Sequence, residues 1–171
     1  MFHSTIQPTD APASSPLFAA INDTNILDNS VEEVFALMLG TPITVSETGI
    51  TPTNIPITLT AVIGLAGALS GAYSVVVNES AAKQIAASML GLEVDSLDDT
   101  VYDALGEITN ILAGAWKSKI GSLHAGCLLS VPTVVTGTHY DIHKKSSSFR
   151  LSRSYRFADS SFTISIYGEQ P

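Results

Sequence analysis

The sequence contains a single cysteine, Cys127, so the chain can form no internal disulfide, which is compatible with a reducing cytoplasm. Basic residues are also scarce: eight Lys and Arg stand against sixteen Asp and Glu, giving a net charge of −8. Nucleic-acid binding in general needs a basic surface that displaces counterions, so we expect no nucleic-acid partner. The first residues show no basic stretch followed by an apolar run, and we expect no signal peptide. These absences favour a cytoplasmic protein.

Charged residues are absent between Glu47 and Glu79, and 21 mostly apolar residues, 57–77, lie in this stretch. That length could span a bilayer. However, residues 57–60 alternate between apolar and polar side chains, as in a half-buried strand, and the flanks lack Lys, Arg and Trp anchors. Residues 64–71 are rich in glycine, which predicts a turn. We therefore expect a β-hairpin and no membrane segment.

The length of 171 residues, with 45% hydrophobic and 14% charged residues, fits one globular domain with its own core. Residues 8–16, PTDAPASSP, contain too many prolines and small polar residues to pack. We accordingly predict a flexible N-terminal tail over residues 1–22 and a single domain over residues 23–171.

The apolar periodicity predicts three main helices and several strands. The helices are expected at 26–39, with Asp28 or Asn29 as N-cap, from Asn78 to Gly91, and at 101–120. Asp98, Asp99 and Thr100 open the last of these, where Thr100 and Asp103 could form a capping box. Strands are expected near residues 43–45, 57–65, 72–77, 127–136, 149–157 and 162–167. This order indicates an α+β fold in which helices pack on a mostly antiparallel sheet.

The predicted helix over residues 101–120 carries an unusual polar side. At about 100° per residue, its polar positions fall in one narrow arc: Asp103, Glu107, Asn110, Gly114 and Lys117. Glycine in a helix interior costs roughly 1 kcal/mol relative to alanine. Despite this cost the helix has a glycine at position 114. Because Gly114 has no side chain, the helix surface is lower there, and another molecule can approach Glu107 and Asn110.

The D-x-x-x-E-x-x-N pattern of Asp103, Glu107 and Asn110 resembles the active-site helix of the CheC/CheX chemotaxis phosphatases. Four blocks of sequence share this resemblance, and they lie at residues 61–77, 81–91, 106–114 and 131–137. The similarity extends over roughly residues 27–167, most of the chain. It implies a CheC-like fold with pseudo-symmetric halves, and a single motif implies the CheX type.

The resemblance also implies a function: acceleration of phospho-aspartate hydrolysis on a CheY-like response regulator. Asn110 would orient the attacking water, Glu107 would pair with a lysine of the regulator, and Asp103 and Gly114 would have supporting parts. The Mg²⁺ would belong to the regulator, and the chain would need no cofactor of its own. CheX-type members pair through sheet edges, so a homodimer is expected. The competing hypothesis is a non-catalytic, flagellar-switch-like module that binds a regulator without dephosphorylating it.

A faint internal repeat appears at an offset of 70 positions, which places Leu27 over Leu97. This alignment puts Leu37 over Glu107 and Gly40 over Asn110, so only the second helix would carry an active surface. Chance matching of residues at helix starts is the alternative.

Three further features of the sequence could have a functional role. The spacing of the possible metal ligands fits no zinc pattern, and we expect no metal site at His124, Cys127, His139 and His143. Five of the eight Lys and Arg residues lie in residues 144–156, either as a solvated hairpin or as a patch that steers an acidic partner. Trp116 could pack in the core or border a partner contact.

Overall fold

A computed structural model describes residues 15–47, 57–138 and 147–169. The described residues form five helices and seven strands, and their order along the chain is α1 (Pro16–Ile21), α2 (Thr24–Leu39), β1 (Thr44–Ser46), β2 (Thr58–Gly67), β3 (Ser70–Asn78), α3 (Glu79–Leu90), α4 (Asp99–Ser118), α5 (Gly121–His124), β4 (Cys127–Leu129), β5 (Thr133–Gly137), β6 (Phe149–Phe157) and β7 (Ser160–Glu169).

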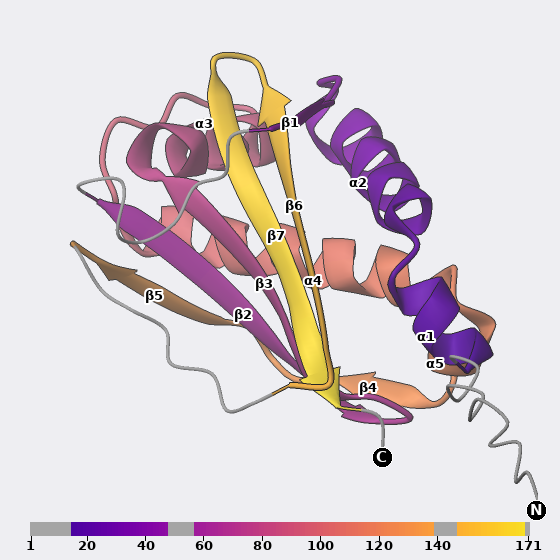
Figure 1. The fold of residues 1–171 in the computed structure, drawn as a ribbon. Coiled ribbons are helices and arrows are strands. Elements are labelled where there is room, and N and C mark those ends of the chain that lie inside the picture. The colour runs from indigo at the N-terminus through magenta and orange to yellow at the C-terminus, as the bar shows by residue number, and fades with distance from the viewer. Residues whose placement is uncertain (1–14, 48–56, 139–146, 170–171) are drawn as a thin grey trace, which may run out of the picture.

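All seven strands join one sheet in the order β1-β6-β7-β3-β2-β4, and β5 also pairs with β2. Every pairing is antiparallel. The long helices α2, α3 and α4 lie on one side of this sheet (Figure 1). The predicted α+β class, with helices on an antiparallel sheet, is therefore confirmed.

The strand order reveals two related halves. Each half supplies a long helix (α2 or α4), an edge strand (β1 or β5) and a hairpin (β2–β3 or β6–β7). The strands lie in the order β1-β6-β7-β3-β2-β5. If each strand is replaced by its counterpart in the other half, the same order results when the sheet is read from its opposite edge. The pseudo-symmetry implied by the resemblance is thus present in the sheet, with β3 and β7 at its centre.

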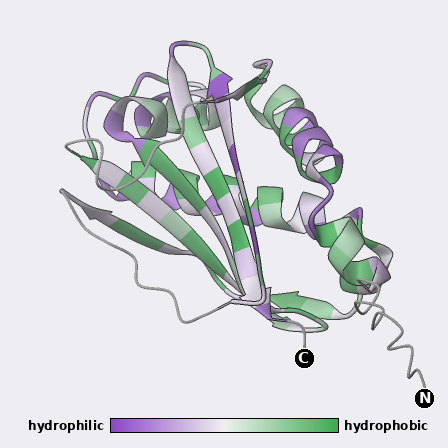
Figure 2. Ribbon diagram, viewed as in Figure 1, coloured by the Kyte–Doolittle hydropathy of each residue, from purple (hydrophilic) through white to green (hydrophobic). Residues whose placement is uncertain are grey.

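The core lies between the sheet and the helices because the strands alternate in polarity. Along β7, Phe162, Ile164 and Ile166 are completely buried, and the hydropathy alternates residue by residue (Figure 2). On the opposite face, hydroxyl groups join neighbouring strands: the Ser152 and Ser165 oxygens are 2.5 Å apart. One face of the sheet therefore builds the core and the other is rich in serine and threonine.

The apolar stretch over residues 57–77 forms the hairpin β2–β3, as predicted, with Thr58 opposite Asn78 and Leu65 opposite Gly71. Among the described residues, no helix is long and apolar enough to cross a membrane.

The N-terminal segment differs from the expectation of a flexible tail through residue 22. Residues 16–21 form α1, which begins where the Ser15 hydroxyl accepts a hydrogen bond from the Phe18 amide. Ile21 is completely buried, and the Phe18 ring packs edge-on against Phe149 at 6.0 Å between centroids. Apolar residues following the proline-rich stretch therefore anchor this segment to the core. Residues 1–14 lie outside the described part of the chain.

Asn78 caps α3 as predicted, but the predicted N-cap of α2 and the predicted capping box of α4 were wrong. The N-cap of α2 is Asp23, not Asp28 or Asn29, and its carboxylate accepts a hydrogen bond from the Asn25 amide at 2.9 Å. The N-cap of α4 is Asp98, which accepts from Thr100 and Val101, so the predicted capping box is absent. In both cases an aspartate closer to the N-terminus satisfies the free amides first.

The single strand predicted over residues 127–136 is interrupted. β4 and β5 both pair with β2, but residues 130–132 between them leave the ladder, and Pro132 lacks the amide that a strand interior would use. The Ser130 hydroxyl instead accepts a hydrogen bond from the Gly64 amide at 2.8 Å. This interruption brings Pro132 against α4.

Candidate functional site

The long helix α4 carries the candidate site on its exposed side. Asp103, Glu107 and Asn110 are exposed, whereas Val101, Leu105 and Ile108 are completely buried against the sheet. The structure therefore confirms the amphipathic arrangement of this helix. The side chains of Asp103, Glu107 and Asn110 form no hydrogen bond or ion pair with another described residue.

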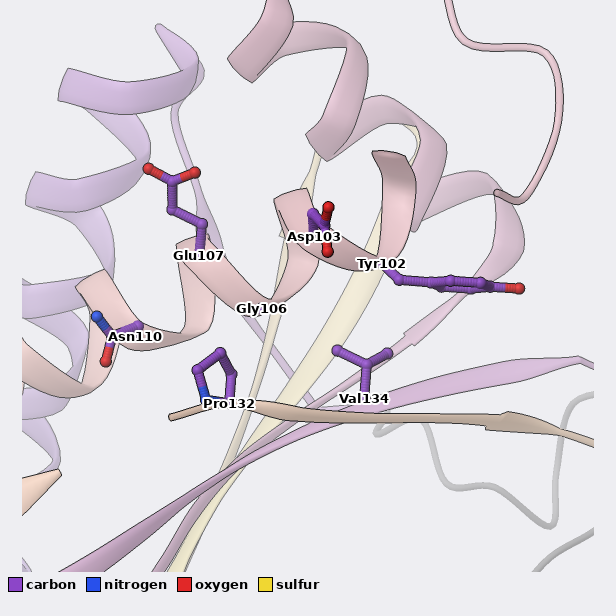
Figure 3. Close-up of a pocket in the computed structure, with 7 residues that line it drawn as sticks. All are labelled: Tyr102, Asp103, Gly106, Glu107, Asn110, Pro132 and Val134. Carbon is purple, nitrogen blue, oxygen red and sulfur yellow. The ribbon is translucent and has the colours of Figure 1, made fainter. Parts of the chain in front are cut away.

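A cavity of about 410 Å³ opens between α4 and the segment leading into β5. Its lining consists of Tyr102, Asp103, Gly106, Glu107, Asn110, Pro132 and Val134. Pro132 and Val134 point toward α4 from the other side of the cavity (Figure 3). The two predicted motif residues Glu107 and Asn110 thus border a shared open space, together with Asp103.

The close approach of α4 to Pro132 depends on Gly106, which the sequence analysis did not single out. A Cβ at position 106 would lie 3.1 Å from Pro132 Cγ and 3.4 Å from Pro132 Cβ. Atoms this close would have to move apart, so only glycine fits at this position without displacement. The sequence did hold a signal: a glycine beside Glu107 in a helix interior, where glycine is unfavourable.

The other polar positions of α4 have different surroundings. A Cβ at Gly114 would meet nothing within 4 Å, which agrees with an open surface at that point. Lys117 is directed away from the cavity, because its ammonium group donates a hydrogen bond to the Cys127 carbonyl on β4. Trp116 is completely buried and lies 6.0 Å from Tyr73 between ring centroids. Trp116 is therefore a core residue and not part of a partner contact.

Several of the remaining candidate residues lie outside the described part of the chain. Within the described ranges, no group of three or more His, Cys, Asp and Glu residues could hold a metal ion, and His139 and His143 lie outside these ranges. Cys127 is buried, and this burial raises the pKa of its thiol. Lys144 and Lys145 also fall outside the described residues, so the basic segment is seen only in β6.

One residue of that segment, Arg153, has a structural role on the core side of β6. Its guanidinium donates to both carboxylate oxygens of Asp28 on α2, at 3.0 and 2.7 Å, and the Tyr155 hydroxyl donates to the same carboxylate at 2.7 Å. Burial alone would raise the pKa of Asp28, but these hydrogen bonds and the Arg153 charge hold it below its usual value.

The internal repeat is present in the structure, but the predicted offset is wrong. At an offset of 74 positions, residues 27–36 of α2 and 101–110 of α4 agree in exposure at nine of ten positions. The offset of 70 gives agreement at only five of ten. A shift of four residues keeps roughly the same helix face, which explains the error. The corrected alignment places Glu33 over Glu107, Ala36 over Asn110 and Glu32 over Gly106.

Comparisons with known proteins agree with this site and fold. Residues 59–153 match the family described as "Chemotaxis phosphatase CheX". A curated protein of Thermotoga maritima, named CheY-P phosphatase CheX, is 32% identical over 145 residues, which cover 83% of this chain and 92% of that protein.

Two solved structures share the fold. The CheX crystal structure from Vibrio vulnificus has a TM-score of 0.73 at 22% identity, covering 92% of this chain and 99% of that one. CheX from Borrelia burgdorferi, solved in a complex with CheY, BeF₃ and Mg²⁺, has a TM-score of 0.65 at 18% identity and covers 86% and 97%. With the family match over more than half of its residues and the 32% identical relative, the chain belongs to the CheX family of chemotaxis phosphatases.

Proposed function

We propose that this chain accelerates hydrolysis of the phospho-aspartate of a CheY-like response regulator. Asn110 orients the attacking water, Glu107 pairs with a lysine beside the regulator's phosphorylation site, and the Mg²⁺ is held by the regulator. The observation that carries the proposal is the placement of Glu107 and Asn110. Both side chains are exposed beside one open cavity, and neither is engaged by another described residue.

The spacing of these two residues suits a reaction at a partner's surface. Residues three apart on a helix lie side by side, about 4.5 Å apart along the axis. An amide can donate and accept hydrogen bonds, so Asn110 can hold a water in line with a phosphorus atom. Phosphoryl transfer requires mainly positioning and charge stabilisation, and an acyl phosphate is already activated. The site therefore needs no nucleophile of its own.

The relatives support this substrate. The Thermotoga protein that is 32% identical is named a phosphatase of phosphorylated CheY. The Borrelia structure holds a CheX and a CheY together, with BeF₃ and Mg²⁺. BeF₃ imitates a phosphoryl group when it binds a carboxylate, and that complex contains BeF₃ together with a regulator.

The experiment is a direct measurement of phosphate loss. Candidate regulators are phosphorylated with acetyl phosphate and Mg²⁺, the donor is removed, and the remaining phospho-aspartate is followed with and without this protein. We expect faster loss with at least one regulator, and Asn110→Ala should remove most of the acceleration. A regulator that binds tightly after BeF₃ activation, but loses phosphate at its intrinsic rate, would instead establish a non-catalytic binding module.

We also propose that the protein is a homodimer and acts in the cytoplasm. The edge strand β5 pairs with β2 on one side, and no described strand pairs with its other side. Apolar residues along this edge are exposed, with Val131 at 83%, Leu128 at 69% and Val135 at 44%. An apolar edge of this kind favours pairing with another chain. Light scattering should give twice the monomer mass, and Val135→Lys should reduce it; a monomeric wild type would contradict the dimer.

A further inference from the structure

The cavity beside α4 is longer than a phosphoryl group requires. Tyr102 and Asn110 are eight positions apart, which corresponds to about 12 Å along the helix axis. Figure 3 shows the Tyr102 side chain beginning near Val134 and its ring pointing past it, at the end of the cavity away from Asn110. A regulator whose phospho-aspartate lies at Asn110 therefore presents a second part of its surface to Tyr102 and Val134.

The walls of this second region differ in character. Tyr102, Pro132 and Val134 form an apolar side, while the carboxylate of Asp103 lies between Tyr102 and Glu107 on α4 (Figure 3). Asp103 and Glu107 are one helical turn apart, where like charges are unfavourable to each other. No described residue neutralises either one. The region thus combines an apolar surface with uncompensated negative charge.

The related helix α2 allows a comparison of matching acidic positions within this chain. Glu33, which corresponds to Glu107, accepts a salt bridge from Lys119 at 2.6 Å. The counterpart of Asp103 is Asn29, which carries no charge. In the first half a lysine of the chain itself therefore binds the matching glutamate, whereas Asp103 and Glu107 in the second half have no cation partner among the described residues.

We infer that the Tyr102–Asp103 end of the cavity binds a basic side chain of the phosphorylated regulator, in addition to the lysine proposed at Glu107. Its aliphatic stem lies along Tyr102 and Val134, and its charged group pairs with Asp103. Arginine and lysine combine an apolar stem with a cationic head, which matches these walls. This inference rests on the proposed function and assigns a specificity-determining contact about 10–12 Å from Asn110 along the helix axis.

The test separates this contact from the chemistry. The variants are Asp103→Asn, Tyr102→Ser and Tyr102→Phe, and Asp159→Asn, in the β6–β7 turn and outside the cavity lining, is the matched control for loss of one negative charge. For each variant, the Kd for each candidate regulator activated with BeF₃ and Mg²⁺ is measured at low and high salt. KM and kcat for phosphate loss are measured alongside.

We expect Asp103→Asn to raise Kd and KM about three- to tenfold, to leave kcat within about twofold, and to weaken the salt dependence. Tyr102→Ser should raise Kd to a similar extent, whereas Tyr102→Phe, which keeps the ring, and Asp159→Asn should behave like wild type.

Four outcomes would overturn the inference. Unchanged Kd in Asp103→Asn would exclude the ionic contact, and a rise with Tyr102→Ser alone would identify a neutral apolar occupant instead. A loss confined to kcat would place Asp103 in the chemistry. If a regulator binds but loses no phosphate faster, the phosphatase proposal is refuted, and the Kd values still test the contact at Asp103. If no activated regulator binds, the phosphatase proposal and the contact at Asp103 are both refuted.

Discussion

Replacing Gly106 by alanine tests whether the distance between α4 and Pro132 sets the position of the catalytic groups. The new Cβ would lie 3.1 Å from Pro132 Cγ and 3.4 Å from Pro132 Cβ. Carbon atoms prefer about 3.5–4.0 Å, so the helix and the proline must separate by roughly 0.5 Å. Glu107 is the next residue along α4 and Asn110 lies one turn away, so both would move with the helix.

The expected effect on stability is small because two contributions oppose each other. Alanine improves helix propensity by about 1 kcal/mol, whereas overpacking in a tight contact costs typically 1–3 kcal/mol. We expect Gly106→Ala to destabilise the fold by about 0–2 kcal/mol. Gly114→Ala provides the stability reference: its Cβ would meet nothing within 4 Å, so it should gain about 1 kcal/mol.

The expected effect on catalysis is larger. A misplacement of about 1 Å can cost on the order of 10²-fold in rate, so a shift of roughly half that size should lower kcat by about tenfold. Denaturant unfolding gives the stability, and phosphate loss at saturating regulator gives kcat. Gly121→Ala, which also meets nothing within 4 Å, is the activity control. An unchanged kcat in Gly106→Ala would refute the claim that this contact positions the catalytic groups.

Further expected outcomes concern the proposed catalytic pair and the core. Asn110→Ala should lower kcat by about 10²–10³-fold with an unchanged fold, and an undiminished rate would exclude its role in orienting water. Glu107→Ala should mainly raise KM, so an effect restricted to kcat at saturating regulator would contradict docking through Glu107. Asp28→Asn should destabilise the protein by about 1–3 kcal/mol. Because the pKa of Asp28 is lowered by folding, this difference should be present above about pH 4 and shrink as the carboxylate is protonated at lower pH. A loss independent of pH in urea unfolding would contradict the ionic contribution.

The apolar patterning of the sequence predicted the fold well because burial dictates it directly. The alternation in β6 placed Phe149, Leu151, Tyr155 and Phe157 on one face, and all four are buried. Arg153 shares this face, yet no periodicity could show that Asp28 of α2, 125 positions away, neutralises it. A pairing of this kind depends on tertiary structure.

The helix termini and the inner wall of the site were less predictable for the same reason. Asp98 and Thr100 are both good N-caps, and the sequence alone does not decide which one the approaching chain presents to the free amides. Glu107 and Asn110 were identified from their spacing on one helix, which is local information. Gly106 and Pro132 meet only because residues 130–132 leave the strand, so the opposite wall of the cavity could not be derived from spacing.

The corrected alignment predicts that the first helix carries no active site. The position of Asn110 is occupied by Ala36, which has no group that could orient water. Glu32 takes the place of Gly106 and is exposed, whereas Gly106 is buried against Pro132. Glu33 keeps the carboxylate of Glu107, but Lys119 already binds it at 2.6 Å. The two helices therefore share a burial pattern, which the sheet requires of both, and they differ where only α4 must leave an amide, an unpaired acid and an open cavity for a partner.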